Sequence, residues 1–234
     1  MKKGTLYIIP VLLGGDDVHA LLPHGTLQRI KPLKYFIVEN SKSARQFLKQ
    51  ADIETSQQEL IINEIDKHSN DLPYSQFLQP ALEGNDIGLL SEAGVPCVAD
   101  PGSGFILAAH KAGIRVVPLT GPSSLLLALM ASGLNGQSFC FHGYLPVNRD
   151  ERIQKLKQLE RDAQSKKQTQ LFIETPYRNN QLLKDMLDTL NAGVKLCIAA
   201  DITLENELIK TMSIASWKKD VPDLHKRPTV FLIL

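Results

Sequence analysis

Several features are scarce in this chain of 234 residues, and each absence narrows its function. The formal net charge is only +1, so overall charge alone does not hold the protein to nucleic acid. A local basic patch is still compatible with this net charge. The three cysteines, Cys97, Cys140 and Cys197, stand singly in or beside apolar runs. We therefore expect buried, reduced thiols rather than a disulfide or metal ligands. No histidine cluster has metal-ligand spacing, and we expect no bound metal.

Long apolar runs are also missing. The longest, Leu125 to Ala131, is too short to span a bilayer, and no signal or anchor segment is evident. We expect a cytoplasmic protein without membrane contact. The chain has no low-complexity tract and no repeat of solenoid period. With 43% hydrophobic residues, it has enough apolar material for one large or two modest domains.

Residues 87–104 carry the most information about function. Ile87 to Leu90 is a short apolar run typical of a buried strand, and it gives way to the loop sequence SEAGVPCVADPGSG. Glycines allow a backbone to approach a ligand closely, and prolines stiffen a loop. Ligands in open α/β sheets bind outside the carboxyl ends of strands, where this loop is expected. Taken alone, such a loop is more often an ordinary connection between a strand and a helix.

The same pattern recurs along the chain. A strand-like run ends in a polar or glycine-containing turn before 120–124, before 174–178 and, more weakly, before 10–15. Apolar helical segments follow the first two, at Leu125 to Met130 and around Leu182. Several such loops predict one composite cleft.

Short apolar runs alternate with helical stretches, which predicts an α/β fold. We expect strands near 5–9, 35–38, 87–90, 115–118, 138–142, 169–174, 195–200, 207–213 and 229–234. Residues 42–50 and 57–67 show helical spacing of their apolar side chains. The Gly-Pro break at Gly121 and Pro122 is the best hinge, so we predict an N-terminal α/β domain over 1–119 and a C-terminal α/β domain with a mixed sheet over 120–234.

The motifs GTLYIIP, SEAGVPCVADPG, TGPSS, FHGYLP and ETPYR, in this order, resemble the tetrapyrrole methylase superfamily. Within it, the sequence is most similar to the bacterial small-subunit ribosomal RNA (cytidine-2'-O)-methyltransferases. The resemblance covers residues 4 to 234. It implies two α/β domains with S-adenosylmethionine in the cleft between them, methyl transfer as the activity and a homodimer as the assembly.

The resemblance also implies which residues hold S-adenosylmethionine. For each of them taken alone, a turn or core role is the alternative, above all for Ile173, Ala199 and Ala200. The implied cofactor-binding residues are Pro10, Ser91, Glu92, Ala93, Gly94, Ser123, Ser124, Ile173, Glu174, Ala199, Ala200, Pro228 and Thr229.

The segments that would meet the methyl acceptor depart further from the family. Its Ala-Glu-Asp-Thr-Arg segment becomes Val38 to Lys42, where only Glu39 is kept, and its Arg-Glu-Leu-Thr-Lys segment becomes Ala200 to Leu204. The leading hypothesis is methylation of a ribose 2'-hydroxyl in small-subunit rRNA. The alternatives are a tetrapyrrole or other small acceptor, and a non-catalytic relative that binds the cofactor.

A ribose hydroxyl has a high pKa and calls for a nearby base. Glu39, Glu92 and Glu174 are the candidates because each lies at a predicted strand end, and a structural ion pair explains any one of them equally well. For contact with rRNA or the small ribosomal subunit, the first candidate is the basic segment Arg149 to Lys167, which includes Arg152 and Lys155. A solvated amphipathic helix is the alternative. A second, weaker basic cluster lies between Lys31 and Lys49.

Overall fold

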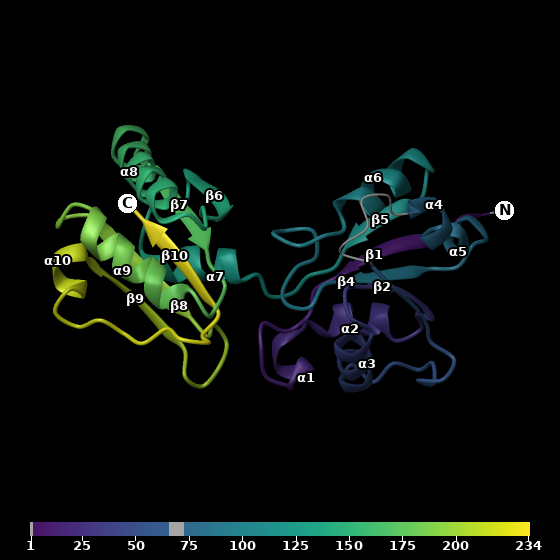
Figure 1. Cartoon of the computed structure of the whole chain (residues 1–234). Coiled ribbons are helices and arrows are strands. Elements are labelled where there is room, and N and C mark those ends of the chain that lie inside the picture. Colours follow the sequence, from purple (N-terminus) through teal and green to yellow (C-terminus); the bar gives the residue numbers. More distant parts are fainter. Residues whose placement is uncertain (1, 66–72) are drawn as a thin grey trace. The chain divides into compact units, whose positions relative to one another are not determined.

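The computed structural model describes residues 2–65 and 73–234, and its chain divides into two compact units (Figure 1). The N-terminal unit ends at Ser123 and the C-terminal unit begins at Ser124. From the sequence we placed the boundary after residue 119. Each unit is built around its own five-stranded sheet.

All neighbouring strands of the N-terminal sheet are parallel, in the order β3-β2-β4-β1-β5. Its central strands are mostly apolar because helices cover both faces, and all four residues of β4 are buried. The strands are β1 (Thr5–Ile9), β2 (Tyr35–Val38), β3 (Ile61–Glu64), β4 (Ile87–Leu90) and β5 (Arg115–Pro118).

The helices of this unit form two layers, with α2 and α3 on one side of the strands and α6 on the other (Figure 1). Phe47 of α3 packs with Phe36 and Leu90, whereas Phe105 of α6 packs with Ile37 and Leu89. The first layer comprises α1 (Val18–Leu21), α2 (His24–Ile30) and α3 (Ser41–Gln50). The second comprises α4 (Tyr74–Phe77), α5 (Gln79–Leu82) and α6 (Ser103–Lys111).

The helix expected over 57–67 is wrong. Residues 57–59 form a turn, and residues 61–64 are strand β3, which pairs in parallel with β2. Two adjacent β-branched isoleucines favour a strand once the edge of β2 is available for pairing, so tertiary context outweighs the helical spacing. The guanidinium of Arg45 holds the turn by donating to the carbonyl oxygen of Gln57. Residues 66 and 67 lie outside the described residues.

The C-terminal sheet is mixed, in the order β6-β7-β10-β8-β9. Strands β6 and β7 are parallel, and the other neighbours are antiparallel. The strands are β6 (Phe139–Tyr144), β7 (Thr169–Ile173), β8 (Lys195–Ala200), β9 (Leu208–Ser213) and β10 (Thr229–Ile233). The helices are α7 (Ser124–Ser132), α8 (Arg149–Lys166), α9 (Asn179–Thr189) and α10 (Ile214–Trp217).

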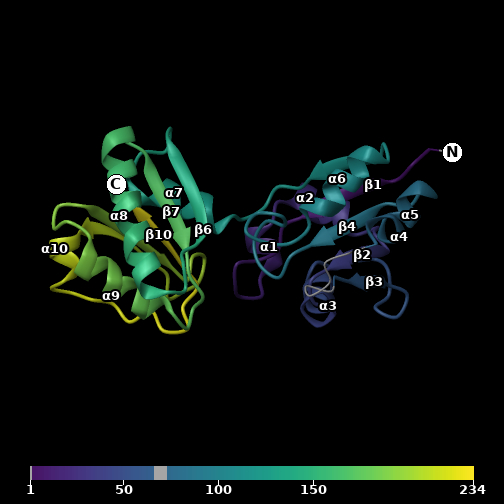
Figure 2. The ribbon, with the colours of Figure 1, turned by 45° about the horizontal axis from the view of Figure 1, so that its top comes forward.

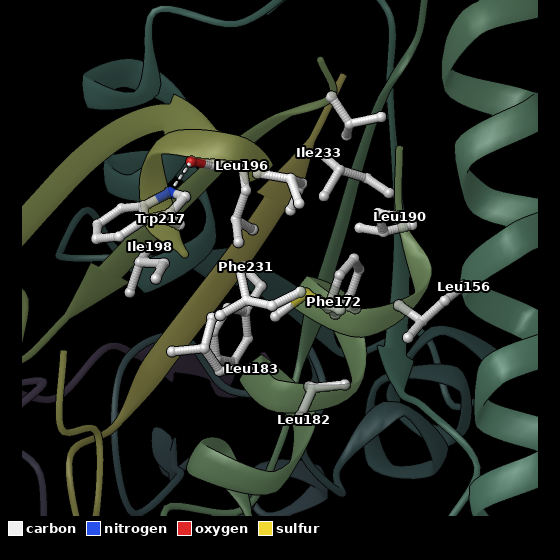
Figure 3. Close-up of a cluster of buried hydrophobic side chains, with 14 of the residues drawn as sticks. Leu156, Phe172, Leu182, Leu183, Leu190, Leu196, Ile198, Trp217, Phe231 and Ile233 are labelled. Carbon is white, nitrogen blue, oxygen red and sulfur yellow. Dashed lines mark hydrogen bonds between the residues drawn. The ribbon is translucent and has the colours of Figure 1, made fainter. Parts of the chain in front are cut away.

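The main core of this unit lies between the sheet and the layer of α8, α9 and α10 (Figure 3). Phe172 and Phe231 stack at 6.0 Å between ring centroids. The buried Trp217 donates from Nε1 to the carbonyl oxygen of Leu196 at 2.8 Å, which satisfies its one polar atom. Helix α7 covers the other face, where Thr211 of β9 donates to the carbonyl oxygen of Ser132 at 2.7 Å. Figure 2 draws α8 and α9 in front of these strands and α7 behind them.

The cysteine prediction is confirmed in part. All three thiols are free, but only Cys197 is fully buried, whereas Cys97 and Cys140 are half-buried. Among residues 2–65 and 73–234, no helix is long and apolar enough to cross a bilayer.

Candidate functional site

The topology of the N-terminal sheet defines one favoured ligand position. Because its strands are parallel, their carboxyl ends lie along one edge. The chain leaves β1 toward the α1–α3 layer and leaves the neighbouring β4 toward α6. Such a divergence between adjacent strands opens a crevice at the sheet edge, where open α/β folds bind ligands. The crevice is therefore expected between residues 10–17 and 91–102.

Backbone contacts tie these loops together. The amide of Val11 donates to the carbonyl oxygen of Gly94 at 2.8 Å. A Cβ atom on Gly94, which has a φ of +69°, would lie 3.1 Å from the side chain of Leu13. A Cβ atom on Gly121 would lie 2.3 Å from Cγ of Pro10. Three strand-end loops thus approach so closely that glycine is required, and they present backbone groups rather than bulky side chains.

The residues predicted in this unit lie along that edge. Pro10 follows β1, and Ser91 to Gly94 follow β4. Ser91 is buried and donates from Oγ to the carbonyl oxygen of Ala93 at 3.2 Å, whereas Glu92 and Ala93 are exposed. Ser123 ends the segment after β5, and α7 begins at Ser124. That these residues contact a cofactor stays a prediction.

Glu39 lies at the same edge, directly after β2, and it is buried. Its charge reaches Cys97 in the loop after β4. Burial, together with the negative charges of Asp100 and Glu39, raises the pKa of the Cys97 thiol to about 11. The thiol is therefore protonated at neutral pH and does not act as a nucleophile.

Apart from Ser124 at the start of α7, the six residues predicted in the C-terminal unit also converge on one sheet edge. Val230 of β10 pairs with Ile173 on one side and with Ala199 on the other, and Thr229 pairs with Ala200. Glu174 and Pro228 adjoin these strand ends. The side chains of Ala199 and Ala200 are fully buried, which fits the core role that sequence reasoning left open. The prediction that both sets of residues form one cleft stays a prediction.

Two buried carboxylates at this second edge are neutralised by arginines. Oε1 of Glu174 accepts from Nη2 of Arg178 at 2.6 Å and from the amide of Thr175 at 2.7 Å. Oδ2 of Asp201 accepts from Nε of Arg227 at 2.6 Å. Sequence reasoning missed the pair of Asp201 and Arg227, because only the pairing of β8 with β10 brings them together.

The expected phosphate contact by Arg152 is wrong. Its guanidinium is buried and donates from Nε and Nη2 to Oδ2 of Asp185, at 2.9 and 2.5 Å. Nη1 donates to the carbonyl oxygens of Pro146 and Val147, so the side chain ties α8 to α9 and to the loop after β6. Arg149 also reaches Asp185, at 3.2 Å, but remains largely exposed. Arg152 therefore has a structural role, although it belongs to the basic segment.

The C-terminal unit also carries a groove of about 590 Å³ between α9 and the loop after α10. Leu183, Leu187 and Val221 line it, and none of the predicted site residues does. In the parts of the chain that the structure describes, no group of three His, Cys, Asp or Glu side chains is arranged to hold a metal ion.

Comparison with known proteins decides the family. The family model of Tetrapyrrole (Corrin/Porphyrin) Methylases matches residues 22–217. The chain belongs to this family. It is therefore a methyltransferase, and the family's activity implies the use of S-adenosylmethionine. The resemblance noted in the sequence is confirmed.

Relatives named Ribosomal RNA small subunit methyltransferase I match most of this chain. The one from Halalkalibacterium halodurans is 32% identical, over 93% of this chain and 72% of the relative. The one from Vibrio cholerae is 30% identical, over 97% of this chain and 76% of the relative. A crystal structure of the methyltransferase CobJ matches with a TM-score of 0.64 at 18% identity, covering 98% of this chain and 93% of CobJ. That likeness confirms the predicted α/β fold.

We predict that Asp185→Ala lowers the free energy of unfolding by about 3–5 kcal/mol at pH 7, because it leaves the buried guanidinium of Arg152 without a counter-charge. Arg149→Ala is the matched control and should cost less than about 1 kcal/mol, since that side chain is exposed. Denaturant unfolding followed by circular dichroism measures both. Equal losses in the two variants would contradict the assignment.

The same ion pair predicts a pH dependence. Burial by itself raises the pKa of Asp185, but hydrogen bonds from Arg152 and Arg149 outweigh it and hold the pKa below its ordinary value. Because the pKa of Asp185 is lower in the folded than in the unfolded protein, its ionisation stabilises the fold above the unfolded pKa of about 3.9. That stability is lost as the pH falls from there through the folded-state pKa. The stability difference between wild type and Asp185→Ala should therefore shrink below pH 4.

Proposed function

We propose that this protein transfers a methyl group from S-adenosylmethionine to a ribose 2'-hydroxyl in small-subunit ribosomal RNA, in the cytoplasm. The observation that carries the proposal is the similarity to two proteins named Ribosomal RNA small subunit methyltransferase I over nearly the whole chain. Retention of the loop SEAGVP, which resembles the rRNA-modifying branch, supports it further. A tetrapyrrole or other small acceptor is the alternative, since the family as a whole is named for corrin and porphyrin methylation.

The crevice between the ends of β1 and β4 is the proposed cofactor position. S-adenosylmethionine combines an amino-acid zwitterion, a ribose, an adenine and a sulfonium, and it needs polar backbone groups at close range. The loops at Pro10, Gly94 and Gly121 offer such groups, because their close packing leaves no room for further side chains. The bound cofactor supplies an electrophilic methyl group for in-line displacement.

The chain's own task is to align the acceptor hydroxyl and to take its proton as the oxygen–carbon bond forms. Of the three candidate bases, Glu174 already accepts hydrogen bonds from Arg178 and Thr175 on one oxygen. Glu39 and Glu92 follow β2 and β4 at the edge proposed for the cofactor. Because both follow strands that end at this edge, we assign the role of general base to one of these two.

The first test concerns cofactor binding. Gly94→Leu should weaken binding of S-adenosylmethionine at least roughly a hundredfold, since a side chain would enter the packed loops. Gly133→Leu is a matched control, because Gly133 has a similar φ of +67° but no atom near its Cβ position. Titration calorimetry, with circular dichroism to verify folding, compares them. A folded Gly94→Leu protein with wild-type affinity would remove this crevice from consideration.

The second test concerns the acceptor. Purified protein with methyl-labelled S-adenosylmethionine should transfer label to small ribosomal subunits or to their naked rRNA, and digestion should yield a 2'-O-methylated nucleoside. Heat-denatured protein is the control. Absence of transfer to both substrates, with the cofactor demonstrably bound, would favour a small acceptor or a non-catalytic role.

We also propose a homodimer. Helix α7 packs one side on β10, β9 and β8, yet Leu126 and Met130 on it are 59% and 78% exposed. Exposed apolar side chains gathered on one helix are typical of an interface. Light scattering should give about twice the 26.0 kDa chain mass. The double change Leu126→Lys and Met130→Lys should give monomers, whereas Val221→Lys, on an exposed residue outside α7, should not. A monomeric wild type would contradict the proposal.

A further inference from the structure

Two tyrosine rings lie exposed where the parallel strands β6 and β7 end. Tyr144, the last residue of β6, is 55% exposed, and Tyr177, four residues beyond β7, is 71% exposed. Tyr144 pairs with Ile173, the last residue of β7, so both rings belong to the same sheet edge. Large aromatic rings are usually buried, and several exposed at one edge suggest a binding surface.

The loop that carries Tyr177 is held firmly. The amide of Arg178 donates to the carbonyl oxygen of Thr175 at 2.9 Å, and the amide of Lys226 donates to that of Pro176 at 3.0 Å. The Tyr177 ring meets the ring of His225 edge to face, with centroids 6.0 Å apart. A ring fixed in this way loses little conformational entropy when a ligand stacks on it.

Side chains beside these rings can contact a phosphate. The Lys226 ammonium and the His225 imidazole are exposed next to Tyr177, and the side chain of Arg178 is partly exposed. The nearby Glu174 carboxylate is buried and already paired with Arg178, so it projects little negative charge to solvent. Asp223 is the exposed acid on the same segment, and it accepts hydrogen bonds from Asn180 and from the amide of His225.

Flat aromatic faces flanked by cationic groups match unpaired nucleotides, whose bases stack while their phosphates pair with the cations. We propose that Tyr177, Tyr144, His225 and Lys226 form a stacking surface for a single-stranded segment of the RNA substrate. The inference rests on the proposed function, and it names how the RNA is held. Base-paired RNA fits poorly, because its bases present no free face to a protein ring. A protein partner on the ribosome is the competing occupant.

Fluorescence anisotropy of the full chain with a labelled single-stranded oligoribonucleotide tests the proposal. Tyr177→Ala should weaken binding by about 5- to 100-fold, the range typical of losing one stacked base. Tyr177→Phe should keep the affinity, since the ring remains. Phe139→Ala is the matched control, because Phe139 is an aromatic residue 43% exposed at the opposite end of β6. The same sequence as a duplex should bind more weakly to wild type.

The outcomes separate this surface from the acceptor proposal. Methyl transfer to rRNA together with wild-type oligonucleotide affinity in Tyr177→Ala would overturn the stacking surface and leave the acceptor proposal standing. Oligonucleotide binding that depends on Tyr177, without methyl transfer to rRNA, would support the surface and contradict the acceptor. A Tyr177→Ala protein that loses affinity only for intact small subunits would point to a ribosomal protein and overturn the RNA contact.

Discussion

The hydrogen bond from the Val11 amide to the Gly94 carbonyl oxygen joins two loops that leave the N-terminal sheet toward opposite faces. Because β1 and β4 are neighbours and their helices diverge, the edge between them would otherwise be an open seam. The bridge joins the two loops by their backbones at the edge where we propose that the cofactor binds. The close packing of these loops requires glycine at positions 94 and 121, because a Cβ atom there would contact Leu13 or Pro10. The proposed cofactor position depends on this contact more than on any single side chain.

The C-terminal unit organises its sheet edge by a different means. The buried carboxylates of Glu174, Asp185 and Asp201 each pair with an arginine. The Asp185 pair joins α8 to α9, and the other two pairs hold the loops at the strand ends. Such pairs add little net stability compared with apolar packing, but breaking one leaves a costly unpaired charge. They therefore fix loop positions around the strand ends. Tyr177 projects from a loop held by the pair of Glu174 and Arg178 and by backbone hydrogen bonds.

The sequence predicted the local structure well where the apolar pattern was unambiguous. The runs at 5–9, 35–38, 87–90 and 115–118 coincide with β1, β2, β4 and β5. It failed at β3, where the adjacent Ile61 and Ile62 pair with β2 instead of continuing a helix. It also failed at Arg152, because a helical pattern does not reveal that Asp185 of another helix faces it. The order of the loop motifs located the candidate site. Local sequence patterns do not predict which side chains from distant segments pair with each other.

Photo-crosslinking of methyl-labelled S-adenosylmethionine to the native protein, followed by mapping of the labelled peptides, tests the central claim most directly. The account predicts that label displaced by S-adenosylhomocysteine lies in peptides containing residues 10–13 or 91–102. Displaceable label confined to other parts of the chain, such as the groove lined by Leu183 and Val221, would contradict it.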